Sequence, residues 1–386
     1  MPIFQDTMIR IVLTGGGTGG HLFPLVAVSR KLNELAVAQN LGEPEIYYLG
    51  PGLFLESSLA REEMNFHYKV LVTGKLRRYF SFKNFIDFFK VIFGVVHASW
   101  EMWKIMPDVI FSKGGYGSVG VVIAGWLYRI PIIIHESDSV PGLTNQILSR
   151  LATFIAVAWN DAARYFPAGK TYYTGESVRD VFFETPQPEK ERAALRLTSQ
   201  KPVILVLGGS QGAQKINDII LDILPELLAN AEVIHQTGDA LYEEVAREAK
   251  IVLEGQPGSL LISYHPTSFL IEPDYASAFC AADLIISRAG AGTIFEIAAS
   301  GKASVLIPLT YSAGDHQRIN AVIFSNDGRA EVVEESNLTP KLLLSVINSI
   351  LNDPEKKKRM EEKARQFATP DASKIIAQAL LNLISK

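Results

Sequence analysis

The chain has 386 residues, of which 48% are hydrophobic and 20% are charged. That length and balance are typical of a globular protein with two domains, each able to bury its own core. The net charge of −4 argues against a protein that wraps nucleic acid. The single cysteine, Cys280, excludes an internal disulfide framework and fits a reducing compartment.

No segment has the sequence pattern of a signal peptide or of a membrane-spanning helix. The N-terminus lacks a basic region before an apolar stretch. No run approaches the ~18–20 uninterrupted apolar residues that cross a bilayer. We therefore expect a protein that is soluble or peripheral to the membrane and faces the cytoplasm.

Short apolar strands alternate with amphipathic helical stretches in the first part of the chain. Such alternation predicts a parallel sheet that is covered by helices on both faces. A first helix is expected to begin near His21. The predicted strands span residues 9–14, 45–49, 108–112, 132–135, 154–158 and 171–174.

The pattern is interrupted after Arg179 and then restarts. Residues 184–200 carry prolines and clustered charges, which are typical of a connector between domains. Further strands are predicted at 202–207, 232–236, 283–287 and 303–308. The sequence thus predicts an N-terminal domain over 1–178, a connector over 179–200 and a second domain over 201–370. It also predicts a C-terminal helix over 371–386 that packs on one of the two domains. The sequence leaves open whether this helix crosses back to the first domain.

The first motif, GGGTGGH at 15–21, follows a predicted strand directly. Glycines at this place let a backbone approach a phosphate, and the helix that follows offers free N–H groups. The spacing also fits a dinucleotide dehydrogenase, but that class needs an acidic residue at the end of the second strand, where this chain has Gly50. A P-loop is excluded because no Gly-Lys-Ser/Thr follows. A structural tight turn remains the alternative.

His21 closes this glycine run at a helix start. The helix dipole there opposes an added positive charge, which tends to keep the imidazole neutral and able to accept a proton. A histidine that merely completes the turn by a hydrogen bond is the alternative.

Two more predicted strand ends in the first domain carry glycine or polar groups. KGGYGS at 113–118 forms a second glycine loop, and Glu136-Ser137-Asp138 follows the next strand. Because carboxyl ends of parallel strands share one sheet edge, these segments together indicate a wide ligand pocket.

The second half repeats the plan of strand, glycine turn and helix. Ser210 follows two glycines at a strand end, where it can bind a phosphate, cap a helix, or do both. The segment 288–296 ends in Thr293-x-x-Glu296, which matches a capping box that needs no ligand. The same segment also suits a diphosphate on helix N–H groups and a carboxylate on ribose hydroxyls.

Residues 75–90 mix cations and aromatic side chains. This combination indicates contact with a membrane surface. A buried helix explains the aromatic residues from Phe85 onward, but it explains Arg77, Arg78 and Tyr79 less well.

With these motifs assembled, the chain resembles the MurG glycosyltransferases, which attach N-acetylglucosamine to the lipid-linked muramoyl-pentapeptide precursor of peptidoglycan. The resemblance runs from Gly15 to about Val333, with the motifs in the family's order. It depends on the segments GGTGGH at 16–21, GGYGS at 114–118, HE at 135–136, PGLTN at 141–145, GxxVR at 175–179, GGSQGA at 208–213, HQTG at 235–238, 288–296 and HQxxNA at 316–321.

The resemblance implies an α/β chain with the GT-B fold, in which two Rossmann-like doubly wound domains face a cleft. It also implies UDP-N-acetylglucosamine as donor, a lipid-linked muramoyl-pentapeptide as acceptor and the cytoplasmic face of the membrane as location. By similarity, Ile271 lies near the main-chain group that reads the uracil edge. The other implied contacts are Thr18, Gly19 and Gly20 with the diphosphate, Arg179 and Ser210 with the nucleotide, Ala291, Gly292 and Thr293 with phosphate through their amides, Glu296 with the ribose, and Gln317 with the sugar.

The chain departs from the family pattern at two places. It has Asp138 where the family usually has Asn, which replaces a neutral donor and acceptor by an anion. The segment around Ile271 also differs, so the uracil contact is placed only to within a residue.

The mechanism we expect is an inverting transfer in which the muramoyl C4 hydroxyl attacks the anomeric carbon of the donor. His21 is the first candidate for the proton acceptor, with Asp138 and Glu136 in reserve. No D-x-D motif stands beside the donor segments, so we expect no metal and no cofactor. The alternatives are transfer to another lipid acceptor such as diacylglycerol, a sugar-nucleotide epimerase, and a non-catalytic UDP-sugar-binding scaffold.

Overall fold

The structure is a computed structural model that describes residues 8–16, 19–52, 66–74, 82–184, 187–197, 200–209, 212–271, 273–310 and 313–384. The chain forms two compact units. Unit 1 comprises Met1–Arg179 together with Thr369–Lys386, and unit 2 comprises Asp180–Ala368.

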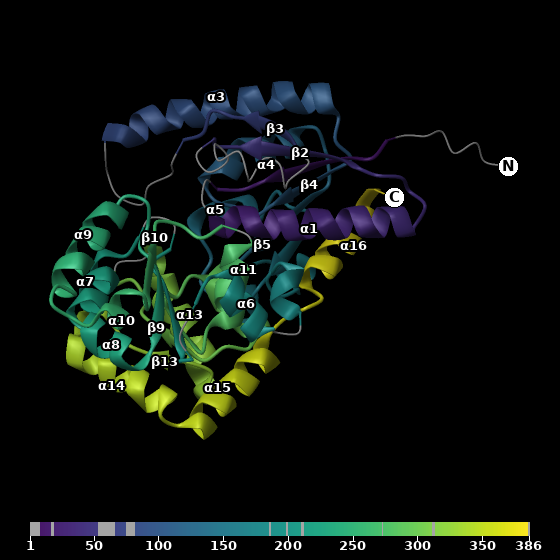
Figure 1. The fold of residues 1–386 in the computed structure, drawn as a ribbon. Coiled ribbons are helices and arrows are strands. Elements are labelled where there is room, and N and C mark those ends of the chain that lie inside the picture. Colours follow the sequence, from purple (N-terminus) through teal and green to yellow (C-terminus); the bar gives the residue numbers. More distant parts are fainter. Residues whose placement is uncertain are drawn as a thin grey trace. The chain divides into compact units, whose positions relative to one another are not determined.

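Unit 1 is built on a parallel sheet in the order β3-β2-β1-β4-β5-β6-β7 (Figure 1). The inner strands are apolar on both faces because helices cover both, and β4 is buried at every position. The strands are β1 (Arg10–Thr14), β2 (Glu45–Gly50), β3 (His67–Val70), β4 (Val109–Ser112), β5 (Ile132–Glu136), β6 (Phe154–Val157) and β7 (Thr171–Tyr173).

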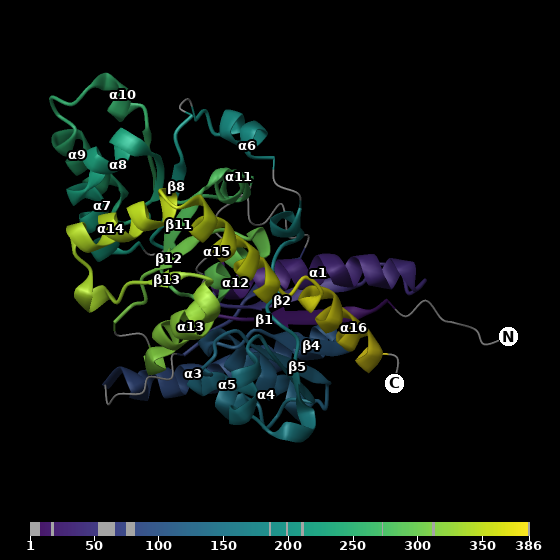
Figure 2. The same cartoon turned by 90° about the horizontal axis from the view of Figure 1, so that it is seen from below.

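The helices of unit 1 lie in two layers, with α1 and α16 on one face of the sheet and α3 and α4 on the other (Figures 1 and 2). Their bounds are α1 (Gly19–Ala38), α3 (Phe82–Ile105), α4 (Val119–Leu127), α5 (Leu143–Leu148) and α16 (Ala372–Ile384). Short 3₁₀ helices are η1 (Tyr116–Ser118), η2 (Asn160–Tyr165) and η3 (Ala168–Lys170).

The C-terminal helix α16 belongs to the core of unit 1. Leu380 and Ile376 join one apolar cluster with Leu25 of α1 and Phe111 of β4. At the rim, the Gln39 amide donates a hydrogen bond to Gln378 at 2.8 Å. The chain therefore returns to its first unit after the whole of unit 2 has been completed.

Unit 2 repeats the architecture with the parallel order β10-β9-β8-β11-β12-β13. One face of its sheet packs against α7, α8, α9 and α14. Its strands are β8 (Val203–Leu207), β9 (Glu232–Gln236), β10 (Tyr264–Thr267), β11 (Leu284–Ser287), β12 (Ser304–Leu306) and β13 (Glu331–Val332).

Helices lie between successive strands of unit 2, since parallel strands cannot be joined by a tight hairpin, and further helices precede β8 and follow β13. They are α6 (Pro188–Ala194), α7 (Gln214–Asp222), α8 (Leu224–Asn230), α9 (Tyr242–Val252), α10 (Gly258–Leu261), α11 (Asp274–Ala281), α12 (Ala291–Ser300), α13 (His316–Ser325), α14 (Pro340–Leu351) and α15 (Pro354–Phe367). Short 3₁₀ helices are η4 (Asp180–Phe183), η5 (Ala313–Asp315), η6 (Asn326–Gly328) and η7 (Glu335–Asn337).

The α/β fold expected from the sequence is confirmed, and each predicted strand is present to within two residues at either end. Three strands escaped prediction: β3, β10 and β13. All three lie at sheet edges, and they are only partly buried. Residues 184–200, which the sequence marked as a connector, include α6, where Glu191 accepts a hydrogen bond from Ser277 of α11 at 2.6 Å.

In the part of the chain that the structure describes, no helix is both long enough and apolar enough to cross a membrane. The long helix α3 exposes several large apolar side chains, among them Phe93 and Trp103.

Replacing Leu380 by Ala tests whether α16 is part of the core of unit 1. Leu380 is 0% exposed, so the cavity should lower the free energy of unfolding by about 2–4 kcal/mol in urea titrations. Ile375 on the same helix is 47% exposed and is the matched control, for which we expect a loss below about 0.5 kcal/mol. Equal losses at the two positions would contradict the packing.

Candidate active site

The motifs found in the sequence flank the point in each sheet where the strand order reverses. In unit 1 this point lies between β1 and β4, and in unit 2 it lies between β8 and β11. Loops diverge there to opposite faces of a doubly wound sheet, which leaves a crevice for ligands at the carboxyl ends. The two glycine loops of unit 1 follow β1 and β4.

The two glycine loops of unit 1 touch backbone to backbone. A Cβ on Gly117 would lie 2.4 Å from the Gly15 carbonyl oxygen. A Cβ on Gly115 would lie 3.1 Å from Gly16 Cα, and Gly115 also has a positive φ of 76°. Side chains are therefore excluded from this contact for steric reasons, independently of any phosphate.

His21 lies on the first turn of α1, with its ring packed against both loops. A Cβ on Gly16 would approach the ring Nδ1 to 3.1 Å, and one on Gly115 would approach Nε2 to 3.3 Å. Burial and the nearby charge of Lys113 lower the pKa of His21 to about 4, against opposing contributions from Asp138 and Glu176. The imidazole is thus neutral near pH 7 and can accept a proton.

Lys113 is a fully buried cation beneath the glycine loops. Its Nζ donates hydrogen bonds to Ser137 Oγ at 2.6 Å, to Glu176 Oε1 at 2.6 Å and to His135 Nδ1 at 2.8 Å. An ammonium group has three donors, so this set satisfies it completely. The cation thereby joins the ends of β4 and β5 to the loop after β7.

The neighbours of Lys113 have protonation states that match these contacts. His135 donates from Nε2 to the Gly175 carbonyl at 2.9 Å, which leaves Nδ1 as the acceptor. Burial and Lys113 lower the pKa of His135 to about 4, so the ring is neutral. Burial is the largest single influence on the pKa of Glu176 and would raise it, but Lys113, His135 and the hydrogen bonds from Lys113 and Ser137 together hold the pKa of the carboxyl below its usual range. Lys113 and Glu176 therefore form a buried ion pair.

Glu136 shapes the loop that carries Asp138. Its Oε1 accepts the Asp138 N–H at 3.0 Å, and its Oε2 accepts the Gly142 N–H at 3.2 Å and the Asn145 amide at 2.9 Å. Burial and the charge of Asp138 raise the pKa of Glu136 to about 7. Both oxygens are committed to the loop, so Asp138, whose charge acts on His21, is the better placed of the two reserve bases.

Arg179 lies beside the first turn of α1. Its guanidinium stacks over the ring of Phe23 at 4.3 Å from the centroid, and the residue is 3% exposed. The stacking holds the Arg179 cation against Phe23, which lies two residues after His21 on α1.

In unit 2, the capping box predicted for Thr293 and Glu296 is wrong. The helix α12 begins at Ala291 with Gly290 as N-cap, and no side chain caps it. Thr293 is therefore the third residue of the helix rather than its cap. The amides of Ala291, Gly292 and Thr293 belong to the first turn, where an α-helix offers no internal acceptor.

Glu296 lies one turn further along α12. Its Oε2 accepts a hydrogen bond from the Tyr275 hydroxyl of α11 at 2.8 Å. The Ile271 carbonyl accepts the backbone N–H of the same Tyr275 at 2.9 Å. The predicted uracil and ribose contacts are thus connected through one tyrosine.

The ends of β11 and β12 are tied together by Glu335. It pairs with Arg288 and accepts the Thr310 amide at 3.1 Å and hydroxyl at 2.7 Å. Next to this, Gln317 Oε1 accepts the Leu309 N–H at 3.0 Å. This contact holds Gln317, in the first turn of α13, against the loop after β12, at the same edge of the sheet as Arg288 and the start of α12.

The structure brings the predicted residues of each unit to one sheet edge, except those outside the described residues. Thr18 and Ser210 lie outside them, and Gly19 and Gly20 open α1. Sequence reasoning missed Lys113, Glu176, Tyr275 and Glu335. Lys113 and Glu176 stand inside quoted motifs, but nothing in the motifs indicates that the two side chains meet.

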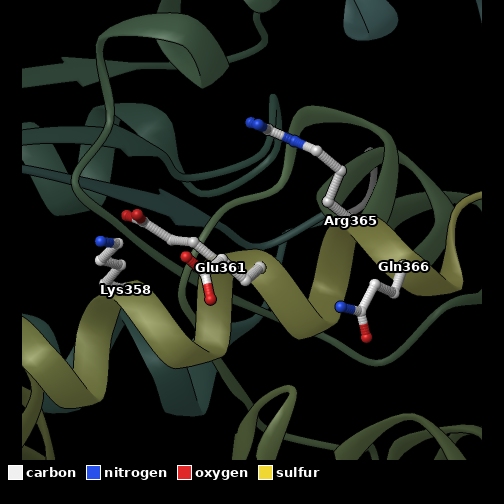
Figure 3. A pocket seen from close by; sticks show the side chains of 5 residues that line it. Lys358, Glu361, Arg365 and Gln366 are labelled. Carbon is white, nitrogen blue, oxygen red and sulfur yellow. The ribbon is translucent and has the colours of Figure 1, made fainter.

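A hollow of about 470 Å³ lies elsewhere, beside α15. Figure 3 shows its lining side chains projecting from successive turns of that one helix. It is lined by Lys358, Glu361, Glu362, Arg365 and Gln366, none of which is a predicted site residue.

A double-mutant cycle tests the buried Lys113–Glu176 pair. Lys113→Met leaves the buried Glu176 carboxylate without its cation and should lower the free energy of unfolding by about 3–5 kcal/mol. Adding Glu176→Gln should recover much of that loss, because no unpaired charge is then buried. Urea unfolding of both single variants and the double variant measures the coupling, and strictly additive losses would contradict the pair.

Comparisons with known proteins agree with this arrangement. Residues 11–157 match the glycosyltransferase family 28 N-terminal domain, and residues 203–376 match its C-terminal domain. The chain is 38% identical to a Bacillus cereus protein named UDP-N-acetylglucosamine–N-acetylmuramyl-(pentapeptide) pyrophosphoryl-undecaprenol N-acetylglucosamine transferase. The aligned region covers 89% of this chain and 92% of the Bacillus cereus protein. A transferase of the same name from Thermodesulfovibrio yellowstonii is 34% identical over 98% and 100% of the two chains.

Among solved structures, Acinetobacter baumannii MurG superposes with a TM-score of 0.70 at 26% identity, covering 97% of this chain and 99% of its own. A UDP-GlcNAc 2-epimerase of Neisseria meningitidis superposes with a TM-score of 0.69 at 15% identity, covering 97% of this chain and 100% of the epimerase. This likeness shows a shared fold. The similarity in sequence extends along both units and includes the loops that carry the candidate site. The chain therefore belongs to the MurG family of glycosyltransferase family 28.

Proposed function

We propose that this chain transfers N-acetylglucosamine from UDP-N-acetylglucosamine to the C4 hydroxyl of the lipid-linked muramoyl-pentapeptide, lipid I, and releases lipid II and UDP. The observation that carries the proposal is the identity of 34–38% along nearly the whole chain with relatives named for this transfer. The candidate site supplies groups suited to each step.

The donor is assigned to unit 2. The first-turn amides of α12 suit the diphosphate, because they point along the helix axis at its positive end. Glu296 suits the ribose hydroxyls, a main-chain group near Ile271 suits the uracil edge, and Gln317 suits the sugar. Ser210 and Thr18 keep their assignments by family resemblance.

The acceptor hydroxyl requires a group that removes its proton as it attacks the anomeric carbon. A neutral imidazole at a pKa of about 4 is available for this throughout the neutral range, and His21 is placed between two glycine loops. The bond from the anomeric carbon to UDP breaks as the new bond forms on the opposite face, which inverts the configuration. The charge that develops on UDP is stabilised by helix N-termini and Arg179.

The acceptor is lipid-linked, and α3 offers a surface that suits a membrane. Its exposed apolar residues recur at helical spacing and define a stripe, with Lys90 and Lys104 beside it. Apolar and aromatic side chains flanked by cations are typical of helices that bind the interface of an anionic bilayer. The stripe consists of Phe89, Ile92, Phe93, Val96, Trp100 and Trp103.

His21→Gln tests the proposed base together with the activity. With UDP-N-acetylglucosamine and lipid I, the variant should lose turnover by about 10²–10⁴-fold while still binding UDP. The exposed histidine His67, replaced in the same way, is the control and should keep full activity. The epimerase alternative predicts UDP-sugar conversion without lipid I, and the scaffold alternative predicts binding without turnover.

Phe93→Ser with Trp103→Ser tests the membrane surface. The two side chains are 64% and 60% exposed, and each contributes about 1.5–3 kcal/mol when buried in a bilayer, so binding to phosphatidylglycerol vesicles should fall at least tenfold. Ile251→Ser with Ile262→Ser on unit 2, at 64% and 60% exposure, is the matched control. Equal losses in vesicle sedimentation for the two pairs would contradict the assignment to α3.

A further inference from the structure

Tyr275 occupies a central position among the proposed nucleoside contacts of unit 2. Its hydroxyl donates to Glu296 Oε2 at 2.8 Å, and its backbone N–H donates to the Ile271 carbonyl at 2.9 Å. Glu296 and Ile271 come from different elements, α12 and the turn before α11. One residue thus fixes the position of both relative to α11.

The ring of Tyr275 is itself held by aromatic packing. It meets Phe279 at 4.9 Å between centroids and Phe182 edge-on at 6.0 Å with an interplanar angle of 86°. Phe182 and Phe279 also pack on each other at 5.1 Å and are both buried. This cluster restricts the ring, so the hydroxyl has a defined position from which to orient the carboxylate.

We propose that Tyr275 is a positioning residue for nucleoside recognition, whose hydroxyl orients Glu296 toward the vicinal hydroxyls of a ribose. The inference rests on the proposed function, because it takes the ribose assignment of Glu296 from it. A carboxylate offers about four lone-pair directions, so a bond from Tyr275 is compatible with bonds from two ribose hydroxyls. The bond reduces the rotational freedom that the carboxylate would otherwise lose when the ligand binds.

Tyr275→Phe is the direct test, because it removes one hydroxyl and keeps the aromatic ring and the backbone bond to Ile271. Calorimetric titration should show UDP bound about tenfold more weakly, which corresponds to about 1.4 kcal/mol. Binding of 2′,3′-dideoxy-UDP should be the same for the variant and the wild type, because that ligand offers no ribose hydroxyls to Glu296. In turnover assays the donor KM should rise with little change in kcat, since the ribose is remote from the reacting carbon.

Two reference variants separate the possible failures. Tyr242→Phe, at the start of α9, controls for loss of a tyrosine hydroxyl and should bind UDP like the wild type. Glu296→Gln should weaken binding of UDP and leave binding of 2′,3′-dideoxy-UDP nearly unchanged. A Glu296→Gln variant that binds UDP normally overturns the ribose assignment in the proposed function and this inference with it.

Two outcomes overturn the inference while leaving the proposed function in place. One is a Tyr275→Phe variant that binds UDP normally although Glu296→Gln does not. The other is an equal loss of UDP and dideoxy-UDP binding in Tyr275→Phe, since that result would assign the hydroxyl a structural role in unit 2 rather than one at the ribose.

Discussion

The ammonium group of Lys113 makes the contact on which the candidate site of unit 1 depends. Lys113 follows β4 and is buried beside the glycine loops, and its ammonium bonds to His135 in β5, to Ser137 just after β5 and to Glu176 after β7. An unpaired charge at this depth would be strongly destabilising, so Glu176 must be present and ionised. The pair thereby fixes the spacing between the second glycine loop, the Asp138 loop and the segment that ends at Arg179.

The same cation sets the protonation states around it. It adds to the effect of burial on His21 and on His135, and both imidazoles are held neutral. For His135 the neutral form serves structure, since the ring accepts from Lys113 and donates to Gly175. For His21 the neutral form is the one that the proposed role as base requires, because a protonated imidazole cannot take a proton from an attacking hydroxyl. A buried ion pair thus links the stability of the strand ends to the state of the proposed base.

Much of this arrangement follows from sequence patterns, and the exceptions have physical causes. Inner strands such as β4 read as continuous apolar runs because helices bury both faces. The edge strands β3, β10 and β13 lack that signal because they are only partly buried. The shared position of the glycine loops could be predicted because the carboxyl ends of parallel strands lie at one edge of the sheet.

Side-chain pairing was less accessible to prediction. Lys113 and Glu176 are 63 residues apart, and only the sheet order brings them together. The T-x-x-E pattern at Thr293 wrongly predicted a capping box. The helix α12 begins two residues before Thr293, at Ala291, and its N-cap is Gly290. The neutral state of His21 was expected from the helix dipole, whereas burial and Lys113 are the causes in the structure.

The proposed chemistry requires that the surroundings of His21 keep its imidazole neutral at the pH at which the transfer proceeds. The most direct test is to follow the imidazole signals of ¹³C-histidine-labelled protein by NMR between pH 5 and 8, with the His21→Gln variant identifying the signal of His21. This signal should keep the chemical shift of neutral imidazole over the whole range, as a pKa of about 4 requires. A His21 signal that titrates near the ordinary pKa of about 6.5 would contradict it.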